Sequence, residues 1–192
     1  MESLKFEQIY SQVEYLKGWM GKEDCRALYD YAKNISGLIL EIGSFMGIST
    51  KVLALSSPQS QVISIDPYFS VHPSSGENDP EYIMERCIYE MFNFNWTLIR
   101  DKSQNAGKIW NRPIDFLHID GDHHYEEVKQ DIELFVPHVK KGCYVFFHDY
   151  VVKGGKEPDG RDEYGIVQAI DETKDYFDEI KVVSGFGVCR KK

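Results

Sequence analysis

Short apolar runs recur along the chain and are separated by amphipathic segments. Five of them are GLILEIG (37–43), QVISID (61–66), WTLIR (96–100), IDFLHID (114–120) and GCYVFFHD (142–149). Runs of this length predict buried strands. Two more runs, EIKVV (179–183) and FGVCRK (186–191), are joined by Ser-Gly and predict a tight hairpin.

Between these runs, apolar residues recur at helical spacing. Phe6, Ile9, Tyr10, Val13 and Leu16 share one helical face. The same spacing predicts helices over residues 25–32, 48–56, 81–92, 125–135 and 163–177.

Strands that alternate with helices predict an α/β fold. We expect a Rossmann-like, doubly wound, mostly parallel seven-stranded sheet with an antiparallel C-terminal hairpin. A single domain is expected over residues 1–192, with an N-terminal helical cover (1–36) and a Rossmann-like core (37–192).

Composition limits the classes of binding partner and the cellular location that we expect. The formal net charge of −9 argues against nucleic acid and against an anionic membrane surface. The four cysteines form no CxxC pair, which suits reduced thiols and a cytoplasmic location. No signal peptide or membrane span is predicted. We therefore expect a small-molecule substrate, and whether the chain forms a homo-oligomer stays open.

The polar residues of interest follow the predicted strands. In an open α/β sheet the ligand site lies beyond the carboxyl ends of the strands, so these residues should converge on one crevice. They are Glu41 and Gly43, Asp66, Ser103 and Gln104, Asp120 to His124, and His148 with Asp149.

The segment EIGSFMGIST (41–50) joins the first strand to a helix. Gly43 and Gly47 allow a tight turn and close backbone approach, and Ser49 lies where helix N–H groups favour an anion. Phe45 replaces the middle glycine of the dinucleotide fingerprint. Glu41 would repel a pyrophosphate but suits a ligand that carries an amine. A turn without any ligand is the alternative.

Asp66 ends the second strand, about 20 residues after these glycines, where an acid commonly binds ribose hydroxyls. The alternative is that Asp66 only starts a turn before Pro67. Ser103 and Gln104 suit hydrogen bonds to an adenine edge, although Ser103 or Asp101 could equally be a helix N-cap.

Together, E-x-G-x-F-x-G-x-S, IDPY, LHIDGDHHYEEVKQDIELF and GCYVFFHDY resemble the class I S-adenosylmethionine-dependent methyltransferases. More narrowly, they resemble the small bacterial subgroup related to catechol O-methyltransferase, to macrolide and aminocoumarin sugar O-methyltransferases and to cephalosporin hydroxylase-like proteins. The resemblance covers most of the chain, from about residue 18 to residue 170.

The resemblance implies methyl transfer from S-adenosylmethionine, most simply to an oxygen of a small molecule. Each matching position then has an implied role. The methionine part would be held by Gly43, Gly47 and Ser49, the ribose by Asp66, and the adenine by Ser103 and Gln104. Asp120 would face the methionine amine or a divalent metal.

Metal-dependent relatives place an Asp after the fourth strand and an acidic or amide pair after the fifth. Asp120 matches the first position, and His148 with Asp149 matches the pair. Magnesium prefers oxygen ligands, so the histidine suits manganese, iron or zinc at least as well. Alternatively, His148 is a general base and no metal is bound.

Asp122 has two possible roles, as a catalytic residue and as the N-cap of the helix that begins at Tyr125. His123 and His124 are interpreted as lining the turn.

The alternatives to a methyltransferase are a nicotinamide-dependent oxidoreductase, a metal-dependent hydrolase built on DGDHH and HD, and a non-catalytic binding protein. The substrate should be shaped by residues 1–36 and by the loops 71–80 and 153–162.

Overall fold

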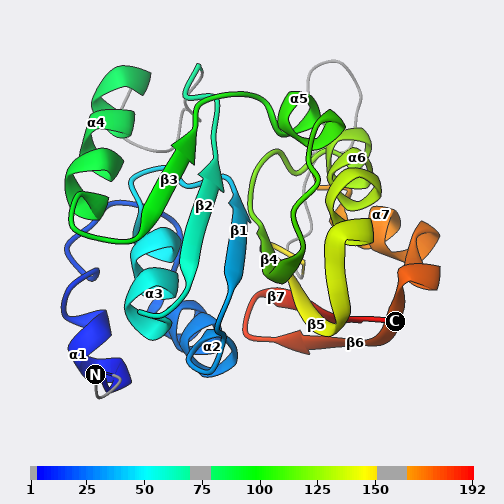
Figure 1. Ribbon diagram of the computed structural model, residues 1–192, viewed down its shortest axis with the longest axis horizontal. Helices are drawn as coiled ribbons and strands as arrows, with labels where there is room; N and C mark the ends of the chain where they lie inside the picture. Colours follow the sequence, from blue (N-terminus) through cyan, green and yellow to red (C-terminus); the bar gives the residue numbers. More distant parts are fainter. Residues whose placement is uncertain (1–3, 70–78, 151–163) are drawn as a thin grey trace.

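A seven-stranded sheet forms the centre of the computed structural model, which describes residues 4–69, 79–150 and 164–192 (Figure 1). The strand order is β3-β2-β1-β4-β5-β7-β6. The strands are β1 (Leu38–Ile42), β2 (Gln61–Ile65), β3 (Trp96–Ile99), β4 (Ile114–Ile119), β5 (Val139–Phe147), β6 (Phe177–Val183) and β7 (Phe186–Lys191).

The pairing pattern confirms the predicted fold class. β1 to β5 are parallel, whereas β7 runs antiparallel to β5 and β6 runs antiparallel to β7. Successive connections lead away from β1 in one direction to β2 and β3, and in the other direction to β4 and β5. The order therefore reverses between β1 and β4, which is where such sheets bind their ligands.

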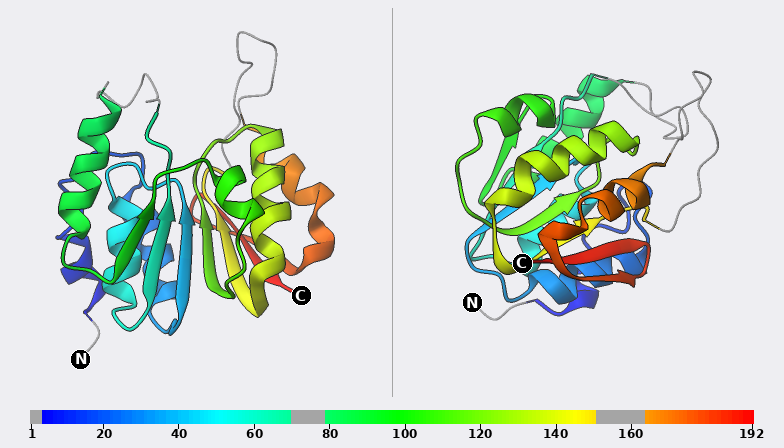
Figure 2. Two further views of the ribbon diagram at one scale, coloured as in Figure 1. Left: turned by 45° about the horizontal axis from the view of Figure 1, so that its top comes forward. Right: turned by 90° about the vertical axis from the view of Figure 1, so that its right-hand side faces the viewer.

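Helices cover both faces of the sheet (Figure 2). The first face carries α1 (Phe6–Tyr10), α2 (Lys22–Ala32), α3 (Ile48–Ser56) and α4 (Pro80–Met91). The second face carries α5 (Ser103–Lys108), α6 (Tyr125–Phe135) and α7 (Ile166–Glu172). Short 3₁₀ turns follow α6 and α7 at Val136–His138 and Lys174–Tyr176. Within the described ranges, none of the helices combines the length and apolar character that crossing a bilayer requires.

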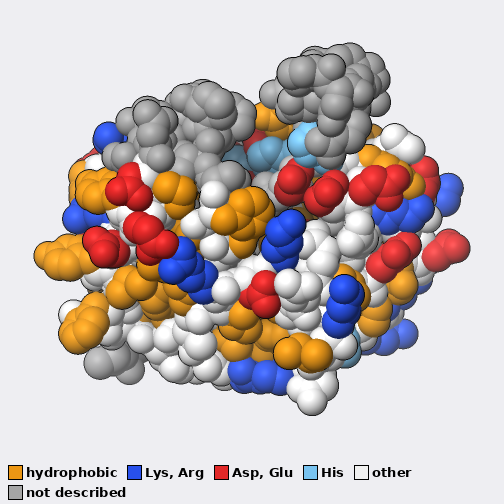
Figure 3. Space-filling model, turned by 90° about the horizontal axis from the view of Figure 1, so that it is seen from above, with side chains coloured by type: hydrophobic (Ala, Val, Ile, Leu, Met, Phe, Trp, Pro, Cys, Tyr) orange, Lys and Arg blue, Asp and Glu red, His pale blue; other side chains and the backbone are white. Residues whose placement is uncertain are grey.

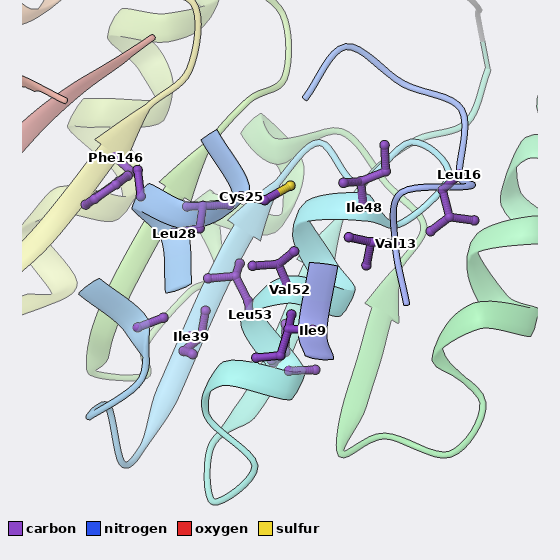
Figure 4. Packing of buried hydrophobic residues seen from close by; sticks show 14 of the residues in the cluster. Ile9, Val13, Leu16, Cys25, Leu28, Ile39, Ile48, Val52, Leu53 and Phe146 are labelled. Atoms are coloured by element: carbon purple, nitrogen blue, oxygen red, sulfur yellow. The ribbon is translucent and has the colours of Figure 1, made fainter. Parts of the chain in front are cut away.

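Alternation along β1 divides its side chains between the two cores. Leu38, Leu40 and Ile42 pack on the second face, and Ile39 packs on the first. Figure 4 shows Ile39 among residues of α1, α2 and α3, including Leu28 and Leu53. Because side chains of a strand alternate, Glu41 shares the first face with Ile39.

Several predicted elements differ from the structure in extent. The first helix ends at Tyr10, and the chain continues in turns, yet Val13 and Leu16 are still buried against the core. β5 begins at Val139 rather than at residue 142. The last helix ends at Glu172, where the Thr173 hydroxyl bonds back to the Ala169 carbonyl.

Of the two roles that the sequence left open for Asp122, the structure excludes the N-cap of α6. The N-cap residue is His124, and its side chain makes no capping hydrogen bond. The predicted loops 71–80 and 153–162 lie outside the described residues, apart from Asp79 and Pro80 at the start of α4.

Gly43 offers a test of how closely the first loop packs on the fourth strand. Its φ is +83°, and a Cβ would lie 2.1 Å from the Asp120 carbonyl oxygen. Gly142 has a similar φ of +79° but no atom within 4 Å of a Cβ. Gly142→Ala should therefore cost only the left-handed strain of about 1–2 kcal/mol. Gly43→Ala should cost clearly more, because backbone must move. Urea unfolding of the two variants measures this difference, and equal costs would show that the close approach is not rigid.

Candidate active site

One row of paired residues marks the carboxyl edge of the sheet. Ile42 pairs with Ile65 on one side and with Ile119 on the other, and the row continues to Ile99 and Phe147. The residue after each member of this row is the first residue beyond its strand. The register therefore brings together Gly43, Asp66, Asp120 and His148.

Figure 3 looks down on this edge, from above the view of Figure 1. Histidine side chains, in pale blue, lie there beside acidic side chains in red. Three loops at this edge hold a non-glycine residue at positive φ: Phe45 at 44°, Tyr68 at 47° and Asp149 at 53°. Such backbone strain concentrates at functional sites.

The loop after β1 turns sharply into α3. Gly43 and Gly47 both have positive φ, and Gly47 is the N-cap residue of α3. Ser49 lies in the first turn of the helix and is buried. The structure thus places these residues at a helix N-terminus that opens towards the edge, where backbone N–H groups can bind an anion.

Asp66 holds two loops together. One oxygen accepts hydrogen bonds from the backbone N–H groups of Ser44 (2.9 Å) and Phe45 (3.1 Å), and the other accepts one from Tyr68 (3.0 Å). Burial raises the pKa of Asp66, and these N–H donors only partly offset it. The Ser44 hydroxyl also lies 3.4 Å from Oδ2, whereas Oδ1 accepts the Tyr68 N–H alone among the described residues, so capacity for a further donor remains on Oδ1.

Glu41 lies elsewhere than the sequence suggested. It is wholly buried beneath the edge, on the α3 face of the sheet. One oxygen accepts hydrogen bonds from Thr50 (2.6 Å) and Ser64 (2.7 Å), and the other lies 3.4 Å from His118 Nδ1. The register explains the contacts, because Glu41 pairs with Ser64 on β2 and His118 on β4. In this arrangement Glu41 does not face a ligand in the crevice directly.

Ser103 and Gln104 begin α5, directly after the end of β3. Ser103 is buried, whereas Gln104 is half-buried. The N-cap residue of this helix is Lys102, so neither Ser103 nor Asp101 occupies that position. Asp101 instead accepts hydrogen bonds from the Lys102 N–H (2.7 Å) and the Asn105 side chain (2.9 Å).

Two aspartates and two histidines cluster at the ends of β4 and β5. His148 Nδ1 lies 3.1 Å from Asp120 and 3.4 Å from Asp149. His123 Nε2 lies 3.4 Å from Asp149 and 3.8 Å from Asp120. The ring of His123 stacks on Tyr164, and Phe186 of β7 packs edge-on against His148.

The charges in this cluster determine its protonation. Burial lowers the pKa of His148, but the carboxylates of Asp120 and Asp149 outweigh it and raise that pKa to about 11. The pKa of His123 is raised by the same two groups against the effect of burial. Burial raises the pKa of Asp120, yet the neighbouring histidines hold it well below its usual range. His148 in this state is therefore a cation, not the neutral base considered from the sequence.

The cluster fits a divalent metal ion. One ligand atom each from Asp120, His123 and Asp149 lie within 4.8 Å of one another. His148 contacts both aspartates but does not complete this group. Mixed carboxylate and imidazole donors suit manganese, iron or zinc better than magnesium. From the sequence, His123 is interpreted as lining the turn and has no ligand role, although its position three residues after Asp120 was the available signal.

Asp122 pairs with His124, two residues later in the turn. Its Oδ1 accepts the backbone N–H of His124 (3.0 Å) and lies 2.5 Å from Nδ1 of the same residue. Burial raises the pKa of Asp122, but the His124 backbone N–H and ring together bring it below its usual value. Asp122 is thus an ionised carboxylate at the edge, with more than half of its side chain exposed.

Comparison with known proteins gives matches in sequence and in fold. Residues 40–150 match a family described as "Methyltransferase domain". Uncharacterized protein R132 of Acanthamoeba polyphaga mimivirus is 26% identical over 73% of this chain and 67% of its own length. The O-methyltransferase NovP has a TM-score of 0.71 at 14% identity, over 98% of this chain and 88% of NovP.

A third similar structure carries ligands. It is the MycE methyltransferase of the mycinamycin biosynthetic pathway, in complex with Mg, S-adenosylhomocysteine and mycinamycin VI. Its TM-score is 0.63 at 16% identity, over 99% of this chain and 55% of MycE. At such identities the two solved structures establish a shared fold.

The charge of His148 can be tested in chelator-treated protein. Its pairing stabilises the fold fully below the ordinary histidine pKa of about 6.5, and that contribution is lost as the pH rises through about 11. The ring should therefore stay protonated between about pH 6 and pH 9. NMR of the histidine rings, assigned with His148→Asn, measures this.

Asp120→Asn removes the carboxylate that lies 3.1 Å from His148 Nδ1, so it should lower the midpoint of the His148 titration. Asp178→Asn changes an exposed acid on β6 and should leave the His148 midpoint unchanged. A His148 midpoint near 6.5 in the unaltered protein would contradict the proposed charge state.

Proposed function

The chain belongs to the methyltransferase-domain family, and from that premise we propose that it transfers a methyl group from S-adenosylmethionine to an oxygen of a small molecule. The family match confirms the resemblance inferred from the sequence. It favours methyl transfer over the oxidoreductase and hydrolase alternatives. The oxygen acceptor is suggested by the O-methyltransferase whose fold the chain shares.

The observation that carries this proposal is the row of paired residues at the carboxyl edge of the sheet. It sets the loop after β1, Asp66 and Asp120 side by side. S-adenosylmethionine has a carboxylate, an ammonium group and ribose hydroxyls. We assign the carboxylate to the α3 N-terminus at Ser49, the hydroxyls to Asp66 and the ammonium to Asp120. Each assignment joins groups of complementary charge or hydrogen-bonding capacity.

Gly43 and Gly47 let the backbone approach the donor, and Ser103 and Gln104 are assigned to its adenine. In this proposal Glu41 supports the donor site without contacting the donor. By bonding to Thr50 in α3 and Ser64 in β2, it fixes the two elements whose ends hold the donor. Methyl transfer is a direct displacement, so fixing the donor and acceptor in line is the main contribution of the protein.

The cluster at β4 and β5 would hold a divalent ion through Asp120, His123 and Asp149. Such an ion, when bound, lowers the pKa of an acceptor hydroxyl and orients it. His148 keeps both carboxylates in place through its contacts to Asp120 and Asp149. As a cation it cannot accept a proton, so we assign that step to the ionised carboxylate of Asp122.

The N-terminal cover is part of the proposal. α1 and α2 pack against α3 on the first face of the sheet, away from the edge. The segment after α1 then reaches the first loop, where the ring of Trp19 lies 5.1 Å from that of Phe45. A Cβ on Gly18 would meet the Ile48 side chain at 2.7 Å, so the segment lies close to the start of α3. We propose that this contact forms one wall of the acceptor pocket.

Donor binding is tested by calorimetry with S-adenosylhomocysteine. Asp66→Asn keeps the shape of the side chain but removes its charge and one of its two acceptor oxygens. Because hydrogen bonds to charged groups contribute about 1.5–3 kcal/mol, affinity should fall roughly 10- to 100-fold. Asp175→Asn changes an exposed acid beyond α7 and should bind as the unaltered protein does. Failure of the unaltered protein to bind S-adenosylhomocysteine or S-adenosylmethionine would refute the proposed function.

A further inference from the structure

A second group of metal-type ligands lies beside the first and is formed by different residues. One ligand atom each from Asp122, His124 and Glu127 lie within 4.8 Å of one another. They come from the turn after β4 and the first turn of α6. The adjacent histidines are thereby divided: His123 belongs to the group with Asp120, and His124 belongs to the group with Asp122.

Two buried oxygens at this place have no hydrogen-bond partner. They are Glu127 Oε2 and Asp131 Oδ1. Asp131 lies one turn after Glu127 on the same side of α6, and its side chain is only 2% exposed. Burial raises the pKa of Asp131 to about 7, a hydrogen bond with the Ser103 side chain opposes this rise, and the nearby charges of Asp122 and Glu127 add to it. Buried oxygens without a donor are costly and call for an explanation.

Three acids thus converge around His124, whose ring Nδ1 lies 2.5 Å from Asp122 Oδ1. The nearest lysine in sequence, Lys129, pairs instead with Glu172 at 2.9 Å. An ion pair with a cation from solvent would satisfy both the excess negative charge and the unpartnered oxygens. Carboxylate oxygens with one imidazole nitrogen are donors that suit a divalent ion such as manganese.

We propose that Asp122, His124 and Glu127 form a second divalent-cation site, with Asp131 behind them as a supporting acid. It is separate from the group of Asp120, His123 and Asp149.

The test is an Mn²⁺ titration of the chelator-treated full chain, followed by electron paramagnetic resonance of free Mn²⁺. The unaltered protein should bind two ions. Glu127→Gln should lower the affinity for one of the two ions at least roughly tenfold and leave the affinity for the other unchanged. Loss of a residue that only hydrogen-bonds to a metal ligand already has an effect of that size, and Glu127 is proposed as a ligand itself. Glu126→Gln, one residue away and exposed, is the matched control and should keep both.

Two further variants assign the sites. Asp149→Asn should weaken the ion that Glu127→Gln leaves in place. His124→Ser replaces the N-cap residue of α6 with a good capping residue, so it keeps the helix while removing the imidazole. It should reproduce the effect of Glu127→Gln, with circular dichroism confirming the fold of each variant.

Binding of one ion that is weakened by Asp149→Asn and is unaffected by Glu127→Gln and His124→Ser would overturn the second site. That result would leave the proposed function standing, because donor binding is measured separately with S-adenosylhomocysteine. Equal weakening by Glu126→Gln and Glu127→Gln would also overturn it, since a general loss of surface charge would then explain the effect.

Discussion

The parallel pairing of Ile42 with Ile65 and with Ile119 fixes where Gly43, Asp66 and Asp120 lie. Because the ends of five strands share one row, the residues that follow them emerge at one edge and at one height. The charged side chains can then meet although they are far apart in sequence. His148 reaches Asp120 at 3.1 Å only because Phe147 stands opposite Ile119 in the sheet. A one-residue slip in any of these strands would turn its side chains to the other face.

The row immediately below supports this edge from inside. Ser64, Glu41 and His118 stand side by side across β2, β1 and β4, and Trp96 donates a hydrogen bond to Ser64 at 2.9 Å. A fully buried polar row of this kind costs free energy unless its groups bond to one another. Here those bonds link α3 to the strands on either side of the switch point. The chemistry at the edge and the polar row beneath it therefore follow from the same register.

Much of this arrangement was accessible from the sequence, because it depends on local signals. Apolar runs gave all seven strands, and the rule that ligands bind beyond strand ends gave Asp66, Asp120 and His148 as neighbours. The start of β5 was missed because Lys140, Lys141 and Gly142 interrupt its apolar pattern. The first helix was predicted too long, since Val13 and Leu16 are buried by turns that happen to keep helical spacing.

What the sequence could not give was the direction of individual side chains near the edge. Glu41 was expected to face the ligand, yet strand alternation turns it into the α3 face, where Thr50 and Ser64 receive it. The N-cap was one of two roles considered for Asp122, whereas the turn places His124 there. His123 was expected to line the turn, but its ring lies 3.4 Å from Asp149 at the end of the neighbouring strand β5. Strand alternation alone places Glu41 on this face, but its partners and the positions of Asp122 and His123 depend on tertiary packing.

The central claim is that one sheet edge binds the methyl donor and a metal ion next to each other. A crystal structure of the full chain with S-adenosylhomocysteine and Mn²⁺, with the ion located by anomalous scattering, tests it most directly. The account predicts the ribose hydroxyls on Asp66, the donor carboxylate at the start of α3, and an ion bonded to Asp120, His123 and Asp149. A donor bound away from this edge, or an ion with none of those three ligands, would contradict it.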